Sequence, residues 1–326
     1  MLEKLGKTDL YTSKIVYGCM GGAGAFGSQE EKDSIEALQT AHEVGINFFD
    51  TAEAYGNGYS EQLLNKALGH VRKDIVILSK AATPNVGKDK IITACERSLK
   101  NLGTDYIDIY LLHWPNREVP FEESLEALEL LKKQGKINHF GVSNYGELDL
   151  KDAVSKSSSI AVNEVAYNLF FRAVEYGTLP TSIENDIPVL CYSSLMQGLL
   201  AGKYKDIKDF PDNRARTRMF DSRTRLQCRH GENGCEAELA EALKNLWSIV
   251  DNSKYSMEEL SVGWLKKQQG VGGVLVGTRN KSQSLALKKL IDVDLDLDVI
   301  NELTKITNKL KSALGPNIDM WDFRTR

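Results

Sequence analysis

The chain has 326 residues, 42% of them hydrophobic, which is enough to bury a large core. Its 41 basic and 45 acidic residues leave a net charge of −4, and such a balance creates no global field that would attract nucleic acid or an anionic membrane. No apolar run approaches the roughly 20 residues that span a bilayer, and residues 1–9 lack the apolar stretch of a signal peptide. We therefore expect a cytoplasmic protein with a small-molecule ligand, no nucleic-acid or membrane partner, and free thiols at its scattered cysteines.

Short β-branched or aromatic runs alternate with amphipathic runs along the chain. Eight strands are predicted, over residues 14–18, 46–50, 75–79, 107–112, 137–142, 161–165, 188–192 and 273–276. Helices are predicted between them, and one of these follows a Ser28-x-x-Glu31 capping box and stops at Gly45. Apolar strands that do not alternate strictly, each followed by a helix, favour a parallel sheet buried on both faces. The simplest architecture that uses all eight is an α/β fold with a single (β/α)8 TIM barrel, so we treat residues 1–326 as one domain.

Polar residues stand at the ends of successive predicted strands. They are Asp50, Lys80, His113, Ser143, Glu164 and Tyr192, at intervals of 30, 33, 30, 21 and 28 residues. The next strand end, at Thr278 and Arg279, lies 86 to 87 residues beyond Tyr192, so this last unit carries an insertion. In a barrel all of these positions lie at the C-terminal face, where active sites of this fold are built.

A glycine-rich segment, Gly22-Ala-Gly24-Ala-Phe-Gly27, imitates a dinucleotide-binding fingerprint. In a true fingerprint the helix opens within the glycines, whereas the capping box here begins after the third glycine. We therefore favour a loop on the upper rim of the barrel over a Rossmann fold.

Asp50, Tyr55, Lys80 and His113 are residue types that together suit proton donation to a carbonyl. A tyrosine with a pKa of about 10 is a poor acid at neutral pH, but an adjacent ammonium stabilises the phenolate and lowers that pKa. Lys80 would supply the ammonium, Asp50 would hold it, and His113 would donate a hydrogen bond to a carbonyl oxygen. Singly, such residues are more often surface ion pairs or rim aromatics. Their placement on three successive strand ends favours a catalytic site.

Several longer segments extend this pattern. They are Leu5-Gly6-Lys7-Thr8, Gly45-Ile-Asn-Phe-Phe-Asp50-Thr-Ala-Glu-Ala-Tyr55-Gly, Leu111-Leu-His113-Trp-Pro115, Gly141-Val-Ser143-Asn144, and Cys191-Tyr192-Ser-Ser-Leu-Met-Gln-Gly198-Leu-Leu-Ala-Gly202-Lys203. With them the whole chain resembles the aldo-keto reductase family. The resemblance implies an opening hairpin, a (β/α)8 barrel, and hydride transfer between a nicotinamide and a carbonyl or alcohol.

The resemblance also implies site roles. Tyr55 would be the general acid, with Lys80 and Asp50 as its tuning pair and His113 orienting the carbonyl. Ser143 and Asn144 would bind the nicotinamide carboxamide, and Tyr192 would stack on the ring. The adenosine phosphate end would be bound by Gly277, Thr278, Arg279 and Gln283, near a helix that begins at Lys281. NADP(H) is the preferred cofactor and NAD(H) the second option.

Glu164 departs from the family pattern, which most often has glutamine at this cofactor-binding position. An ionised glutamate accepts from the carboxamide NH2 but cannot donate to its oxygen, and it would favour the oxidised, positive nicotinamide. The alternative is a tolerated near-isostere. Leu287 also replaces an asparagine of the family, which leaves the adenine contacts less defined than the phosphate site.

The insertion at residues 203–234 is rich in arginine: Arg214, Arg216, Arg218, Arg223, Arg225 and Arg229. It would act as a lid over the cofactor diphosphate or an anionic substrate, or else form a solvated, ion-paired loop or a subunit contact. Within it, Cys228, His230, Glu232 and Cys235 have a spacing that matches no common zinc motif, so we expect no metal. The tail at residues 314–326 carries Trp321 and Phe323 and is expected to dock, at the substrate pocket, on the barrel's flank or on a neighbouring subunit.

The sequence thus predicts an NADP(H)-dependent oxidoreductase acting on a small polar carbonyl or alcohol, with a sugar or an aldehyde as options. Two alternatives remain open: an epimerase or lyase that retains its NAD(P), and a cofactor-binding regulatory subunit like the channel-associated members of the family. A homo-oligomer is also left open.

Overall fold

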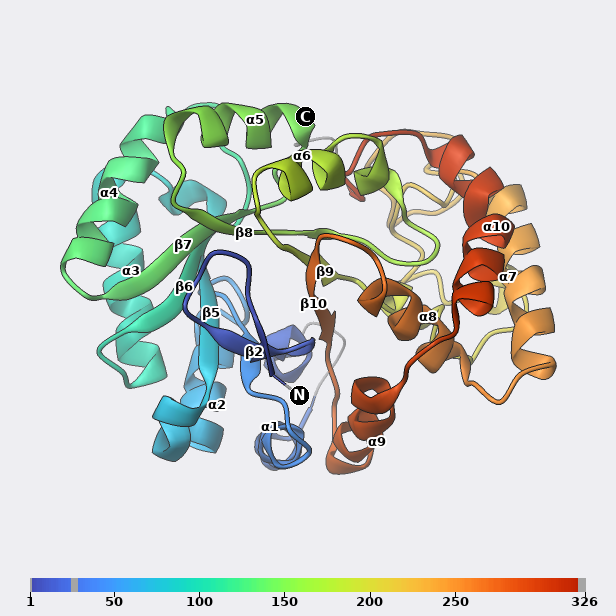
Figure 1. The fold of residues 1–326 in the computed structure, drawn as a ribbon, viewed down its shortest axis with the longest axis horizontal. Helices are drawn as coiled ribbons and strands as arrows, with labels where there is room; N and C mark the ends of the chain where they lie inside the picture. The colour runs from blue at the N-terminus through green and yellow to red at the C-terminus, as the bar shows by residue number, and fades with distance from the viewer. Residues whose placement is uncertain (1, 25–28, 322–326) are drawn as a thin grey trace.

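A closed barrel of eight parallel strands lies at the centre of the computed structural model, which describes residues 2–24 and 29–321 (Figure 1). In order around the barrel the strands are β10 (Val271–Val276), β3 (Ile15–Gly18), β4 (Phe48–Asp50), β5 (Val76–Ala81), β6 (Ile107–Leu112), β7 (Ile137–Ser143), β8 (Ile160–Ala166) and β9 (Val189–Tyr192). All eight predicted strands are observed to within two residues at each end. The predicted (β/α)8 barrel is confirmed.

An antiparallel hairpin precedes the barrel. It pairs β1 (Leu2–Lys4) with β2 (Tyr11–Ser13), and its turn contains the predicted Leu5-Gly6-Lys7-Thr8 segment. Leu5 is buried and packs into the barrel's interior cluster. Gly6 has a φ of 48°, and a Cβ there would lie 2.5 Å from the Pro188 ring, so the close approach of the turn requires glycine.

Helices surround the barrel, as Figure 1 shows. They are α1 (Glu31–Glu43), α2 (Tyr59–Leu68), α3 (Lys88–Leu102), α4 (Phe121–Lys133), α5 (Glu147–Lys156), α6 (Thr178–Glu184), α7 (Glu236–Asp251), α8 (Met257–Lys266), α9 (Lys281–Asp292) and α10 (Leu297–Leu314). One predicted boundary is wrong: α1 begins at Glu31 with Glu30 as N-cap, and that side chain makes no capping hydrogen bond. Ser28 and Gly27 lie outside the described residues. Among the residues that the structure describes, no helix is both long and apolar enough to cross a membrane.

The strands bury two separate apolar layers because their side chains alternate between the two faces. One layer fills the barrel: Leu5, Val16, Phe48, Val76, Leu78, Ile109, Leu111, Ala161, Val162, Leu190 and Leu275. The other lies between the strands and the surrounding helices. Apolar side chains therefore fill the barrel below its C-terminal mouth, and the polar strand-end residues lie directly above them.

The insertion and the C-terminal tail are packed against each other. Arg218 is 6% exposed, and its guanidinium donates to the carbonyl oxygens of Asn317 (2.7 Å) and Leu314 (3.1 Å). It also forms an ion pair with Glu232 at 2.9 Å, while its backbone N–H donates to the carbonyl of Met320. The tail docks, as expected, and the carbonyls of Leu314, Asn317 and Met320 bind the insertion. Phe323, Arg324 and Arg326 lie outside the described residues.

Candidate active site

The polar strand-end residues lie close together because side chains alternate between the two faces of each strand. Each inward-facing polar residue follows an interior core residue by two positions: Asp50 after Phe48, Lys80 after Leu78, His113 after Leu111, Glu164 after Val162 and Tyr192 after Leu190. Because the strands are parallel and period two keeps both residues on the same face, these side chains meet at the C-terminal mouth of the barrel.

Lys80 is the centre of this group, and its side chain is fully buried. Its ammonium forms a short ion pair with Asp50. It also donates to the Thr51 carbonyl at 3.0 Å and to the Tyr55 hydroxyl at 3.4 Å, and it lies 3.4 Å from Oε2 of Glu164. The predicted Asp50, Tyr55 and Lys80 cluster is assembled as expected. The contacts to Thr51 and Glu164 were not foreseen, because the first involves a main-chain group and the second crosses the barrel.

Tyr55 and His113 lie together, with ring centroids 5.7 Å apart in an edge-to-face arrangement. Burial and the Lys80 charge lower the pKa of His113 to about 3, so its imidazole is neutral. The pKa of Tyr55, by contrast, is raised above its ordinary value. Burial outweighs the pull of Lys80, whose charge is already matched by the Asp50 carboxylate. The predicted lowering of the Tyr55 pKa is therefore wrong for this arrangement, in which the phenol keeps its proton.

Glu164 is 3% exposed and stands on β8 facing Lys80. Burial and the neighbouring Asp50 raise its pKa to about 8. A glutamate that is protonated near neutral pH can donate a hydrogen bond. This changes the expectation of an ionised, accept-only side chain at this position.

Ser143, Asn144 and Tyr192 form a hydrogen-bonded chain beside this cluster. The Asn144 amide donates to the Ser143 hydroxyl and to the His113 carbonyl, both at 3.0 Å, and its Oδ1 accepts from the Tyr192 hydroxyl at 2.7 Å. Trp321 of the tail donates to the Tyr192 hydroxyl at 3.4 Å. The tail therefore reaches the mouth of the barrel, a contact between β9 and a residue 129 positions away that no local pattern reveals.

The predicted phosphate-binding residues lie at the start of α9. Arg279 and Gln283 line a cavity of about 370 Å³ together with Asn280, Gln29, Glu30 and Asp33. Gln29 donates to the Arg279 carbonyl at 2.8 Å and accepts from the Arg279 side chain at 3.2 Å. Asn280 caps α9 by accepting from the N–H of Gln283 at 3.0 Å. The contribution of Gln29 was missed, because it comes from the opposite end of the sequence.

Thr278 and Gly277 make contacts within the wall of the barrel. The Thr278 hydroxyl is buried between the hydroxyls of Tyr17 (3.0 Å) and Ser284 (2.6 Å). A Cβ on Gly277 would lie 2.8 Å from the Gly18 carbonyl oxygen, so glycine permits the close approach between the ends of β10 and β3. Both residues thereby position the N-terminus of α9.

The family model described as "Aldo/keto reductase family" matches residues 14–308 of this chain. The chain belongs to the aldo/keto reductase family. Aldo-keto reductase YhdN of Bacillus subtilis is similar to it, with 31% identity over 330 residues, 96% of this chain and 95% of the relative. Methylglyoxal reductase YeaE of Escherichia coli is 39% identical over 172 residues, 52% of this chain and 60% of the relative. The crystal structure of an aldo-keto reductase from Klebsiella pneumoniae in complex with NADPH is similar at a TM-score of 0.73 and 25% identity, covering 94% of this chain and 96% of the other.

These matches identify this aldo-keto reductase as an oxidoreductase.

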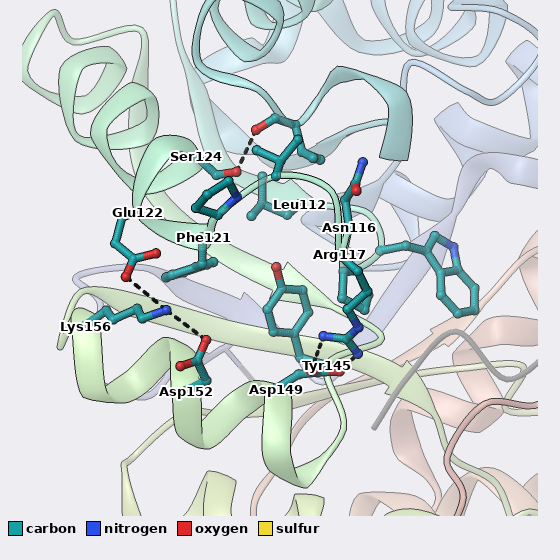
Figure 2. Close-up of a pocket in the computed structure, with 15 residues that line it drawn as sticks. Leu112, Asn116, Arg117, Phe121, Glu122, Ser124, Tyr145, Asp149, Asp152 and Lys156 are labelled. Carbon is teal, nitrogen blue, oxygen red and sulfur yellow. Dashed lines mark hydrogen bonds and ion pairs between the residues drawn. The ribbon is translucent and has the colours of Figure 1, made fainter.

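A second cavity, of about 260 Å³, lies between the segment that follows His113, the start of α4, and α5 (Figure 2). Trp114, Phe121 and Tyr145 are among its lining residues. Its charged groups face one another: Arg117 pairs with Asp149, and Lys156 with Glu122 and Asp152. We assign no chemistry to this cavity.

Several of the candidate metal ligands in the insertion make other contacts. Cys228 donates to the Ala215 carbonyl at 3.2 Å, His230 Nδ1 accepts from the N–H of Glu232 at 3.0 Å, and the Glu232 carboxylate binds Arg218. In the described ranges no group of three or more such side chains is arranged to hold a metal ion.

Five of the six arginines of the insertion divide into two groups. Arg218, Arg223 and Arg225 form ion pairs within the insertion and with α7, which fits the ion-paired-loop interpretation for this part. Arg214 lies beside Gly198, because a Cβ on that glycine would be 3.2 Å from the arginine's Nη1. Nε of Arg216 is buried and, within residues 2–24 and 29–321, has no hydrogen-bond partner.

Proposed function

We propose that this enzyme reduces small polar carbonyl compounds with NADPH, and oxidises the corresponding alcohols in the reverse direction. The supporting observation is the cluster at the barrel mouth, where a protonated Tyr55 hydroxyl lies 3.4 Å from the Lys80 ammonium and beside a neutral His113. A buried proton donor next to a hydrogen-bonding imidazole suits protonation of a carbonyl oxygen that accepts a hydride.

The residues present fit a nicotinamide dinucleotide. Oε2 of Glu164 is buried without a hydrogen-bond partner among the described residues, and a carboxamide NH2 would satisfy it. At the other end, Arg279 lines an open cavity at the N-terminus of α9, which suits the 2'-phosphate of NADP(H) more than the ribose hydroxyl of NAD(H). Asn144 and Tyr192 would exchange their mutual hydrogen bond for contacts with the ring. When bound, the cofactor supplies the hydride.

The protein's own groups then divide the remaining work. Tyr55 would give its Oη proton to the carbonyl oxygen, and Lys80 would stabilise the phenolate that remains. The neutral imidazole of His113 would donate a hydrogen bond that orients the carbonyl. Asp50 keeps the Lys80 ammonium in place by its ion pair.

Methylglyoxal is a rational first substrate, because the relative YeaE is named a methylglyoxal reductase. Aldoses and simple ketones form the rest of the panel. Turnover is followed by the absorbance of the reduced nicotinamide with NADPH and with NADH. We expect net oxidation of NADPH by at least one small aldehyde, faster than oxidation of NADH at equal low concentration.

Two other outcomes would replace this proposal. Conversion of an added sugar without net cofactor oxidation would assign an epimerase or lyase that retains its cofactor. Tight cofactor binding without turnover of any carbonyl compound would favour a regulatory subunit.

For the insertion, we propose that Arg214 and Arg216 face the cofactor diphosphate, in keeping with the position of Arg214 beside Gly198 in the segment after β9 and with the orphaned Nε of Arg216. Peptide mapping of timed tryptic digests tests this lid. With NADP+ bound, cleavage after Arg214 and Arg216 should slow, while cleavage after the exposed Arg223 continues. Protection only after an anionic product is added would assign the two arginines to the substrate, and unchanged cleavage would leave a passive loop.

A further inference from the structure

Two carboxyl groups compete for one lysine at the centre of the site. Lys80 has three N–H donors. It faces four acceptors: the Asp50 carboxylate, the Thr51 carbonyl, the Tyr55 hydroxyl and the Glu164 carboxylate. Its ammonium donates to the Asp50 carboxylate in an ion pair, and Glu164 lies 3.4 Å away with its Oε2 lacking a hydrogen-bond partner in the described part of the chain. The lysine therefore satisfies Asp50 and leaves Glu164 in need of a proton of its own.

The charges around Glu164 point the same way. Asp50 on β4 and Lys80 on β5 are the charged groups that face it, and the neighbouring Tyr55 and Tyr192 phenols keep their protons because burial raises their pKa values. His113 after β6 is neutral, and burial also raises the pKa of the Cys19 thiol near Asp50. With both carboxyls ionised this buried group would carry one uncompensated negative charge. One added proton makes it neutral and so removes the desolvation penalty of an uncompensated buried charge.

We propose that Glu164 is an exchangeable proton store: it is protonated in the cofactor-free enzyme and beside reduced nicotinamide, and it loses this proton when oxidised nicotinamide binds. The inference rests on the proposed function, which places the nicotinamide next to Glu164. Oxidised nicotinamide is positive and reduced nicotinamide is neutral. Only the oxidised form can take over the charge compensation that the proton provides.

This store also balances the protons of carbonyl reduction. The carbonyl oxygen takes the proton of Tyr55 Oη, Tyr55 regains one from Lys80 Nζ, and Lys80 regains one from Glu164. Both links exist, since Lys80 lies 3.4 Å from the Tyr55 hydroxyl and 3.4 Å from Oε2 of Glu164. Glu164 is then ionised, and it is reprotonated from solvent when the oxidised cofactor leaves. A glutamine at this position has no such proton to give.

The test is the pH dependence of binding. Dissociation constants for NADP+ and NADPH are measured by fluorescence titration between about pH 6 and about pH 8 for the wild type, Glu164→Gln and Glu61→Gln. Glu61 is a matched control, because its carboxyl is also buried but accepts a hydrogen bond from the Ser79 hydroxyl. Ser79 precedes Lys80 on β5, so its side chain faces the surrounding helices and not the barrel mouth. The ratio of the two constants is compared, because the 2'-phosphate, which titrates near pH 6, is common to both cofactors.

In the wild type and in Glu61→Gln the ratio of the NADP+ constant to the NADPH constant should fall about tenfold per pH unit, as one released proton requires. In Glu164→Gln the ratio should stay constant. A pH-indicator dye in weak buffer gives a second readout: about one proton should appear per NADP+ bound near pH 7 by the wild type, and none by Glu164→Gln. Infrared difference spectra of the cofactor-free proteins should show a protonated carboxyl band that Glu164→Gln lacks.

A constant ratio in the wild type, or a slope that survives in Glu164→Gln, would overturn the inference while the proposed function stands. Proton release by the wild type needs no variant, so its absence would overturn the inference even if Glu164→Gln failed to fold. A wild-type protein that binds neither cofactor would overturn the proposed function and this inference with it.

Discussion

The barrel mouth and the insertion both hold charged side chains in ion pairs, yet water reaches them very differently. At the mouth, Lys80 and its carboxylate partners are 0% and 3% exposed. In the insertion, Arg223 pairs with Asp221 while 67% of its side chain stays exposed. Buried charges interact strongly and shift one another's pKa values, whereas exposed pairs are screened by solvent. The same residue types therefore build a chemical site in one region and a hydrated surface in the other.

The largest effect is expected for Lys80→Met. It leaves two buried carboxyls without their cation, so the free energy of unfolding should fall by about 3–5 kcal/mol and carbonyl reduction should be lost. Both carboxyls already have raised pKa values, so the folded variant binds more protons than the unfolded chain. Its stability should therefore fall as pH rises, and urea unfolding should show a larger deficit near about pH 8 than near about pH 5.

Lys88→Met is the control for this change, because Lys88 pairs with Glu126 at the surface. Its unfolding curve should match that of the wild type. Equal losses in the two variants would contradict the distinction between buried and exposed ion pairs.

Tyr55→Phe should lower carbonyl reduction by about 10²-fold or more while leaving cofactor affinity unchanged, since it removes the proposed general acid alone. Steady-state rates with NADPH and fluorescence titration of the cofactor measure the two quantities separately. Tyr176→Phe, at an exposed tyrosine on η4 (Ala173–Tyr176), should keep the parental rate. If Tyr55→Phe reduces aldehydes as fast as the wild type, the proton comes from elsewhere.

Arg218→Ala tests the exception within the insertion, because Arg218 is buried and bonded to the tail. Two carbonyls and Glu232 lose a charged donor, so the free energy of unfolding should fall by about 2 kcal/mol and proteases should reach residues 315–321 sooner. Arg223→Ala should give an unfolding midpoint indistinguishable from the wild type. The comparison fails if the exposed arginine proves as important as the buried one.

The smallest effect is expected for Arg279→Ala. NADPH binding should weaken about tenfold more than NADH binding, because only NADPH offers a 2'-phosphate to the guanidinium. Fluorescence titration with both cofactors measures the difference. Lys288→Ala, on α9 where Lys288 pairs with Asp292, should leave both affinities unchanged. Equal losses for the two cofactors in Arg279→Ala would place this arginine away from the 2'-phosphate.

Local periodicity was sufficient to predict the barrel and most of the residues in the catalytic cluster. In α3 the buried residues have the spacing of one helix face: Ile91, Ala94, Cys95, Ser98, Leu99 and Leu102. Strand order follows from chain order in a parallel barrel, so Asp50, Lys80 and His113 could be placed at one mouth from their spacing alone. The start of α1 was misplaced because the capping-box pattern at Ser28 and Glu31 specifies only a local preference.

The sequence by itself determined which side chains meet at the barrel mouth, because alternation and parallel strand order are properties of neighbouring residues. Only the tertiary structure decided their electrostatic state. The raised pKa values of Tyr55 and Glu164, and the contacts of Trp321 and Arg218, depend on burial and on distances between residues far apart in the chain. A residue's solvation and its partners across the fold are absent from any local pattern, and those two quantities set its charge.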